Sequence, residues 1–412
     1  MDVRIISREI IKPSSSTPYH LRTYKLSGLD QTIINGHIPI VFFYSTAPKS
    51  CEGLKKSLSE ILTHYYPLAG RLKDYLSIDC DDSGVSFVEA RVAGNMSDVL
   101  KQLEIDPQEQ LLPCKVKELL TSRSILAVQV SYFACGGAAI CLLFRHVCID
   151  ATAAANFIKS WAAIAACGGI DFTVQDVIFD CTSIFPPTDD SVIPENTCTE
   201  DILYSLKENV RRRFVFEGSK ISALQEKIGN RPTRFEAVFA LILGAITTGQ
   251  REGKGFTATF PVNLRKRMNP PIPEQCIGNI HTIVQTNRPR EEATNYSSLT
   301  AKVRELISMV NGEYVKQASP DGWLLRKDVE NDTDGMFMIS SWCTLPLYET
   351  DFGWGKPTVV VPLGRLNSGD HIAVVLLDTG NDKGIEAWVS MSKEGMDKFE
   401  QDSGVIAYAS LI

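Results

Sequence analysis

Residues 125–152 read ILAVQVSYFACGGAAICLLFRHVCIDAT and combine three kinds of local pattern. Two apolar runs flank the Gly136-Gly137 pair, a pattern typical of two antiparallel strands joined by a turn. An alanine-rich run with helical character follows from about residue 151 to 166, and Gly168-Gly169 supplies its stop. The stretch therefore predicts strand, turn, strand and helix, with His146 where the second strand gives way to the helix.

The same alternation of strands and helices continues on both sides of this stretch. Apolar residues at helical spacing predict a helix over 51–66, which Pro67 ends. Thr233, three residues before Glu236, predicts a capping box at the start of a buried helix. The pattern indicates an α/β protein. Further strands are expected at 41–46, 212–216, 358–363, 371–378 and 385–391.

The length of 412 residues favours two domains. Between residues 180 and 205, prolines, aspartates and threonines replace the periodic apolar pattern. This composition is typical of a connection between domains. We expect an N-terminal domain at 1–180, a crossover at 181–211 and a C-terminal domain at 212–412.

Composition and charge exclude several classes of partner. The formal net charge is −7, which argues against nucleic acid and against an anionic membrane surface. No apolar run reaches the roughly 18 residues of a membrane-spanning helix, so we expect no membrane insertion. The first 18 residues alternate apolar and charged side chains, which is atypical of a signal peptide. These features favour a cytoplasmic protein.

The 11 cysteines show no CxxC pair and are scattered through apolar stretches. We expect neither a disulfide framework nor a zinc cluster, and therefore a reducing compartment and no bound metal. Small buried residues are expected at Cys135, Cys141, Cys148 and Cys167.

His146 and Asp150 lie four residues apart in FRHVCIDAT, at 144–152. In one interpretation His146 ends a strand and Asp150 caps the next helix, because aspartate is a favoured N-cap residue. In a second, the two belong to a metal site, although no third histidine or cysteine follows at a suitable spacing. In a third, His146 is a general base, since a pKa of about 6.5 suits proton removal from an alcohol. The residues themselves leave these interpretations open.

Residues 351–357 read DFGWGKP, which by itself indicates a tight turn with a buried aromatic ring. HxxxD in mid-chain together with DFGWG resembles the joint signature of the BAHD acyltransferases, plant enzymes that use acyl-CoA. The branch that contains vinorine synthase and the acylsugar acyltransferases is the most similar. The resemblance extends to LDQ at 29–31, HYYPLAGRL at 64–72, PVNLRKRMNPPIPEQCIGN at 261–279 and SSWCTLPLYET at 340–350.

This resemblance implies a two-domain chloramphenicol-acetyltransferase-like fold. Each domain would hold a mixed β-sheet with flanking helices, and the active-site channel would run between the domains. The implied activity is transfer of a short aliphatic acyl group, such as acetyl, from CoA to a hydroxyl of an alkaloid or a partly acylated sugar. The protein would be a monomer that binds acyl-CoA as a co-substrate and holds no cofactor. The alternative is a catalytically silent member that binds CoA thioesters or serves as a scaffold.

The resemblance also implies roles for single residues. His146 would be the general base, and no acyl-enzyme would form, so Cys148 need not be a nucleophile. Asp150 would pair with Arg265 and hold the loop that orients His146. Ser340 and Trp342 would contact the acceptor or the oxyanion. The DFGWG motif would shape the CoA side of the channel with Asp351, Phe352, Gly353, Trp354 and Gly355. CoA-phosphate contacts, or else solvated surface cations, are expected at Lys266, Arg267 and Lys356.

Overall fold

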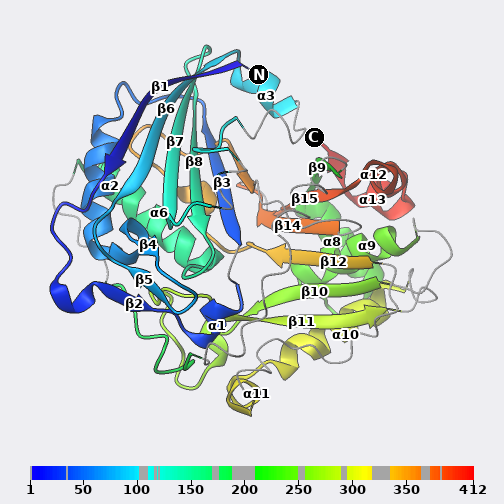
Figure 1. Cartoon of the computed structure of the whole chain (residues 1–412). Helices are drawn as coiled ribbons and strands as arrows, with labels where there is room; N and C mark the ends of the chain where they lie inside the picture. Colours follow the sequence, from blue (N-terminus) through cyan, green and yellow to red (C-terminus); the bar gives the residue numbers. More distant parts are fainter. Residues whose placement is uncertain are drawn as a thin grey trace. The chain divides into compact units, whose positions relative to one another are not determined.

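The computed structural model divides the chain into two compact units (Figure 1). The first contains Met1–Thr197, Pro273–Ile280 and Pro346–Gly364, and the second contains the remainder. The structure describes residues 2–33, 36–101, 110–115, 118, 121–168, 176–187, 209–248, 256–288, 295–317, 335–362, 372–380 and 383–412. Most of the crossover expected at 181–211, namely 188–208, lies outside these residues.

The first unit is built on a six-stranded sheet. Its strands, in order across the sheet, are β1 (Asp2–Ile11), β6 (Val85–Ala93), β7 (Leu126–Phe133), β8 (Ala138–Arg145), β3 (His37–Tyr44) and β13 (Val359–Pro362). All neighbouring strands are antiparallel except β6 and β7, which run parallel.

The hairpin predicted around Gly136-Gly137 is confirmed as β7 and β8, with Tyr132 opposite Ala138. Gly136 adopts a φ of +84°, which favours glycine at this turn. Every residue of β8 is buried, both the apolar run 138–144 and Arg145.

The predicted helices of this unit are also confirmed. They are α2 (Glu52–His64) and α6 (Ala151–Ala166), which pack against each other beside the sheet (Figure 1). Trp161 of α6 is fully buried, and its Nε1 donates to Oγ of Ser57 on α2 at 3.0 Å. The unit also contains α1 (Gly28–Gln31), α3 (Met96–Lys101) and a small sheet of β2 (Thr23–Lys25), β5 (Ser77–Asp79) and β4 (Arg71–Leu72).

The DFGWG residues 351–355 were expected in the C-terminal domain, but they lie in the first unit. The reason is strand pairing, because β13 follows them directly and Val359 pairs with Phe43 of β3. The segment Pro273–Ile280 likewise joins the first unit, where the backbone N–H of Ile277 donates to the carbonyl of Ile178 at 2.9 Å.

The second unit is built on a seven-stranded mixed sheet. β10 and β14 run parallel to β12 between them, and the other pairs are antiparallel. Its strands, in order, are β11 (His281–Arg288), β10 (Phe256–Asn263), β12 (Gly335–Ser341), β14 (Ile372–Asp378), β15 (Ile385–Ser392), β9 (Asn209–Phe216) and β16 (Ser410–Leu411). The five strands predicted from apolar runs are thus confirmed as β3, β9, β13, β14 and β15, with small shifts at their ends.

The second unit also contains helices, among them the predicted buried helix (Figure 1). They are α8 (Gly218–Ile228), α9 (Arg234–Thr248), α10 (Tyr296–Met309), α11 (Gly312–Gln317), α12 (Lys393–Glu400) and α13 (Ser403–Tyr408).

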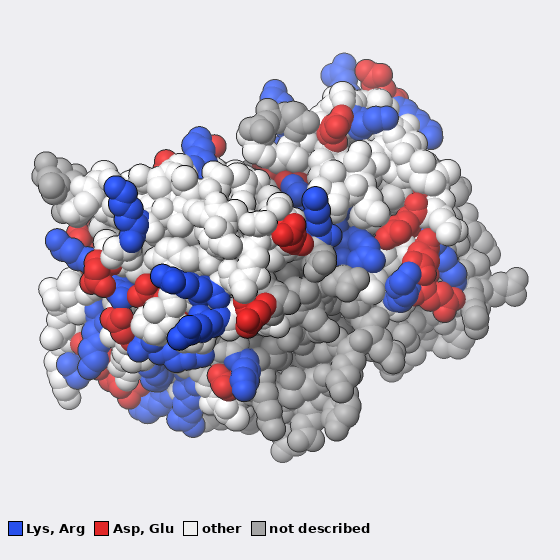
Figure 2. All heavy atoms as spheres, turned by 90° about the horizontal axis from the view of Figure 1, so that it is seen from above, with Lys and Arg blue, Asp and Glu red and all other residues white. Residues whose placement is uncertain are grey.

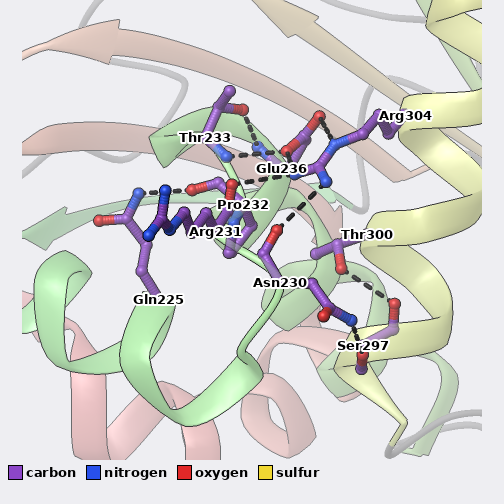
Figure 3. Close-up of polar contacts among 9 residues, drawn as sticks. All are labelled: Gln225, Asn230, Arg231, Pro232, Thr233, Glu236, Ser297, Thr300 and Arg304. Atoms are coloured by element: carbon purple, nitrogen blue, oxygen red, sulfur yellow. Dashed lines mark hydrogen bonds and ion pairs between the residues drawn. The ribbon is translucent and has the colours of Figure 1, made fainter.

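The capping box of α9 is confirmed (Figure 3). The N–H of Thr233 donates to Glu236 at 2.7 Å, and the N–H of Glu236 donates to Oγ1 of Thr233 at 3.2 Å. Arg304 of α10 pairs with Glu236 at 2.7 Å and also donates to the carbonyls of Asn230 and Arg231. The cap therefore also fastens α10 to the start of α9.

The prediction for the cysteines is partly wrong. Cys141 and Cys148 are buried, as expected, but Cys135 and Cys167 are exposed. Both exposed residues lie at element ends, Cys135 in the turn between β7 and β8 and Cys167 at the C-cap of α6. No disulfide joins the cysteines in the described ranges.

Surface charges of both signs are interspersed on the face drawn in Figure 2, with wide uncharged areas between them. Within the described ranges, no helix combines the length and the apolar character needed to cross a membrane.

Candidate active site

His146 is the first residue after β8 and is partly exposed. Its backbone N–H donates to the carbonyl of Gly36 at 2.8 Å. The two segments come so close that a Cβ at Gly36 would lie 3.0 Å from Cβ of His146 and 3.2 Å from Cγ2 of Ile33. The glycine therefore permits the backbone contact that places the histidine.

The side chain of Asn279 holds the imidazole of His146. Oδ1 of Asn279 lies 2.7 Å from Nδ1 of the ring. Nδ2 of Asn279 donates to the carbonyl of His146 at 2.6 Å and to Oδ1 of Asp30 at 3.0 Å. With its N–H groups on these two acceptors, the amide turns its oxygen toward the ring, and an amide oxygen only accepts. Nδ1 therefore carries the proton, and Nε2 keeps its lone pair.

The surroundings of His146 favour the neutral ring. Burial lowers the pKa of His146 below its usual value, because the site disfavours the charged form. The charge of Asp150 and the hydrogen bond to Asn279 oppose this shift in part. A neutral imidazole with its lone pair on Nε2 can accept a proton from a hydroxyl at neutral pH.

Asp30 lies behind Asn279 and is fully buried. Oδ1 accepts the backbone N–H of Asn279 at 2.8 Å as well as the side-chain amide. Oδ2 accepts the backbone N–H of Ser27 at 2.9 Å and its hydroxyl at 2.7 Å, in the capping box of α1. Burial raises the pKa of Asp30 to about 6, although the hydrogen bonds from Ser27 and Asn279 lower it.

Asp150 is the N-cap residue of α6, as the first interpretation of HxxxD proposed. One carboxylate oxygen accepts the N–H of Ala153 at 2.9 Å, and the other accepts the N–H of Ile280 at 3.1 Å. The carboxylate thus holds the start of α6 against the segment that carries Asn279. Its pairing with Arg265 stays a prediction. As for the metal interpretation, no group of three or more His, Cys, Asp or Glu side chains suited to a metal ion occurs among the described residues.

The segment 273–280 that carries Asn279 makes close contacts with the rest of the first unit. Gly278 has a φ of +138°, and a Cβ there would lie 3.1 Å from Sγ of Cys181. The Sγ atoms of Cys181 and Cys276 are 3.1 Å apart, and both thiols are buried. A side chain at 278 would displace the loop and with it the amide that holds His146.

The DFGWG motif forms the tight turn with a buried aromatic ring that its sequence predicts. Oδ1 of Asp351 accepts the N–H groups of Gly353 at 2.7 Å and Gly355 at 2.9 Å, and both glycines have positive φ. The ring of Phe352 is buried and lies 4.8 Å from that of Trp161, edge to face. Trp354 stacks on Phe352 at 5.6 Å. The role of the motif toward CoA stays a prediction.

The basic candidates differ in their environments. Lys266 is exposed, and Lys356 is exposed and forms an ion pair with Glu349. Arg267 instead donates to the carbonyls of Ile307 and Val310 at the end of α10, at 2.9 and 3.0 Å. Basic groups there complement the free carbonyls of a helix C-terminus. Arg267 is thus part of the second unit's structure, and a CoA-phosphate role stays a prediction for all three.

The remaining candidates also belong to the second unit. Arg265 begins the short helix η5 (Arg265–Arg267) and is buried, and its N–H donates to the side chain of Asn263 at 2.9 Å. Ser340 lies in β12 opposite Val375 of β14. The N–H of Trp342 donates to the carbonyl of Leu376 at 2.7 Å. Their roles toward substrates stay predictions.

Sequence reasoning assigned no role to Asn279, Asp30 or Gly36. Asn279 ends the stretch 261–279 and Asp30 lies in LDQ at 29–31, so both occur in segments that carried the family resemblance. That resemblance was the available signal, since nothing in the local sequence pairs residues 249 positions apart. Gly36 had no such signal.

The chain is similar to known proteins over nearly its whole length. The model of the Transferase family matches residues 1–405. The chain is 46% identical to epi-neemfruitin B synthase of Melia azedarach, over 100% of this chain and 99% of the relative. It is 44% identical to a limonoid 1-O-acetyltransferase of Citrus sinensis, with the same coverage. It is 37% identical to stemmadenine O-acetyltransferase of Catharanthus roseus, over 97% and 96%.

Among solved structures, vinorine synthase superposes with a TM-score of 0.83 at 31% identity, covering 99% of both chains. Fusarium graminearum TRI101, crystallised with coenzyme A and T-2 mycotoxin, shares the fold with a TM-score of 0.75 at 16% identity. The expected two-domain fold with mixed sheets is confirmed.

Proposed function

Since the chain belongs to the BAHD family of acyltransferases, we propose that it transfers an acetyl group from acetyl-CoA to a hydroxyl of a limonoid. The limonoid 1-O-acetyltransferase at 44% identity supports this acceptor. Alkaloid alcohols, expected from the sequence, are the second candidate and are supported by stemmadenine O-acetyltransferase at 37% identity.

The proposed mechanism rests on which ring nitrogen of His146 holds the proton. Nδ1 is hydrogen-bonded to Asn279, so Nε2 is the atom that removes the proton of the acceptor hydroxyl. The hydroxyl oxygen then attacks the thioester carbonyl and forms a tetrahedral intermediate. The carbon–sulfur bond breaks as this intermediate collapses, and the proton on Nε2 passes to the departing CoA thiolate. The products are the acetyl ester and CoA, with no acyl-enzyme.

The other site residues support this reaction. Asp150 and Arg265 form the ion pair that keeps the loop of His146 in place. Ser340 and Trp342 contact the acceptor or the oxyanion, and the DFGWG turn keeps the CoA side of the site in shape. Phosphates of CoA bind to Lys266, Arg267 and Lys356. The protein acts as a cytosolic monomer.

The test is a product assay by mass spectrometry. The wild type is incubated with acetyl-CoA and three separate panels, namely limonoid alcohols, alkaloid alcohols and partly acylated sugars. We expect products heavier by one acetyl group in the limonoid panel and none with His146→Ala. The matched control is His20→Ala, because His20 is exposed and should leave the rate unchanged.

Products in another panel would replace the proposed acceptor, and products made by His146→Ala would overturn the mechanism. If acetyl-CoA binds but no panel yields a product, the silent-member alternative gains support over the proposed function. Binding by calorimetry distinguishes that case from a protein that does not recognise acetyl-CoA.

A further inference from the structure

Asp30 has a buried carboxylate, and the mechanism above assigns it no role. It accepts four hydrogen bonds, two from Asn279 and two from Ser27. The ion pairs found among the described residues include none with Asp30. Burying a carboxylate without a cation is unfavourable even when it is hydrogen-bonded. A role for the charge would explain why the chain retains it.

The geometry around Asn279 suggests that role. Its amide has two orientations that differ by exchange of Oδ1 and Nδ2. As oriented, Nδ2 lies 3.0 Å from Oδ1 of Asp30 and 2.6 Å from the carbonyl of His146. Turned over, the amide oxygen would face both acceptors, and its N–H groups would face Nδ1 of the ring. Nδ1 would then have to accept, and the proton would move to Nε2, the atom that must receive a proton from the acceptor hydroxyl.

Two acceptors thus favour the productive orientation, and they differ in strength. The carbonyl of His146 is neutral, whereas Asp30 supplies a charged oxygen, and hydrogen bonds to charged groups are the stronger kind. The backbone N–H of Asn279 also donates to the same oxygen at 2.8 Å, so the carboxylate cannot turn away without losing both bonds.

We propose that Asp30 is a positioning residue for His146, acting through Asn279. Its carboxylate fixes the orientation of the Asn279 amide, and the amide keeps the ring proton on Nδ1 and the lone pair on Nε2. When Nε2 takes up the substrate proton, Nδ1 still donates to the same oxygen, so Asn279 does not have to move during the reaction. The inference rests on the proposed function for the reaction, but the state of the ring can be measured without it.

The test uses the full chain with ¹⁵N-labelled histidine, in wild type and in Asp30→Asn. NMR distinguishes protonated from unprotonated ring nitrogens, and His146→Gln identifies the signals of His146 among the 6 histidines. We expect one form with the proton on Nδ1 in the wild type, and a mixture of both forms in Asp30→Asn. The kcat of Asp30→Asn should fall in proportion to the fraction of rings protonated on Nε2, about twofold for an equal mixture, with little change in KM.

Ser27→Ala is the matched control. It removes a donor from the other oxygen of Asp30 and weakens the cap of α1, but it leaves the bonds to Asn279 in place. The proton of His146 should stay on Nδ1 in this variant. If Asp30→Asn does not fold, Asp30→Ser replaces it, because serine adds no amide donor toward Asn279.

A ring proton that stays wholly on Nδ1 without Asp30 would overturn the proposal, whatever the rate. A mixture that also appears in Ser27→Ala would overturn it as well, since loss of the α1 cap would then be the cause. If the mixture appears only without Asp30 but the wild type acetylates no acceptor, the positioning role stands and the proposed function fails.

Discussion

A single carboxylate oxygen of Asp150 accepts the N–H of Ile280 at 3.1 Å, across 130 residues of sequence. The other oxygen caps α6 through Ala153. Asp150 therefore joins the helix that follows His146 to the segment that holds its ring. In this arrangement the second polar residue of HxxxD supports the site through its two hydrogen bonds.

Replacing Asp150 with alanine should reduce both stability and rate. The change removes a helix cap and leaves the N–H of Ile280 without its carboxylate, so we expect a loss of about 2 kcal/mol or more in the free energy of unfolding. Urea denaturation measures this loss, and kcat should fall because Asn279 is next to Ile280.

Asp402→Ala is the control for this prediction, since Asp402 caps α13 through Gly404 and Val405. It should reduce stability by about 1 kcal/mol, a typical value for a cap, and leave kcat unchanged. Equal effects of both variants on kcat would show that Asp150 acts only through overall stability.

The rate of acyl transfer should fall with decreasing pH, with a midpoint below 6.5. Burial lowers the pKa of His146, so the neutral base persists to more acidic pH than an exposed histidine would allow. The measurement is kcat/KM between pH 5 and 9 at constant ionic strength. A midpoint at or above 6.5 would contradict the described environment of the ring.

Asp30 should make the protein less stable as pH rises from 4 to 7. Its pKa is about 6 in the folded chain against 3.8 ordinarily, so the folded chain binds the proton more tightly than the unfolded chain. The resulting stabilisation is complete below 3.8 and lost as pH rises through 6, and it amounts to about 3 kcal/mol at most. The measurement is the difference in unfolding free energy between wild type and Asp30→Asn at pH 4 and pH 7. A difference that is the same at both values would refute this assignment.

Gly36→Ala should lower the rate of the reaction while most of the protein stays folded. The new Cβ would lie 3.0 Å from Cβ of His146, so the histidine has to shift. Displacement of a catalytic group by a few tenths of an ångström to 1 Å lowers rates by about tenfold to a hundredfold. The control is Gly53→Ala in α2, where a Cβ meets nothing within 4 Å and alanine favours the helix. Equal rates of the two variants would contradict the prediction.

Phe352→Ala should destabilise the first unit by about 3–5 kcal/mol, because it removes a buried ring that packs on Trp161. Lys356→Ala, at an exposed position in the same segment, should change stability by less than about 1 kcal/mol. Urea denaturation tests both. A loss of less than about 1 kcal/mol for Phe352→Ala would contradict the packing role of the motif.

The parts of the structure that could be predicted from sequence are those fixed by near neighbours. The turn at Gly136, the cap at Asp150 and the capping box at Thr233 each depend on residues within a few positions, so local patterns were sufficient. His146 was placed correctly at the end of its strand for the same reason.

What could not be predicted depends on pairing over long distances. Asn279 meets His146 across 133 residues, and Val359 pairs with Phe43 across most of the chain. No periodicity encodes such partners, because each segment reads as an ordinary loop or strand on its own. For the same reason, residues 351–355 were expected in the C-terminal domain, whereas contacts group them with the first unit.

The return of residues 346–364 to the first unit determines when that unit can be completed during synthesis. β3 has β8 on one side from an early stage, but the partner for its other side is β13, which ends at Pro362. A ribosome adds roughly 5–20 residues per second, so this edge stays open for at least about ten seconds after β8 has formed. Unpaired strand edges promote association between chains. A fragment that ends near residue 197 would retain that edge permanently, together with a histidine that lacks Asn279.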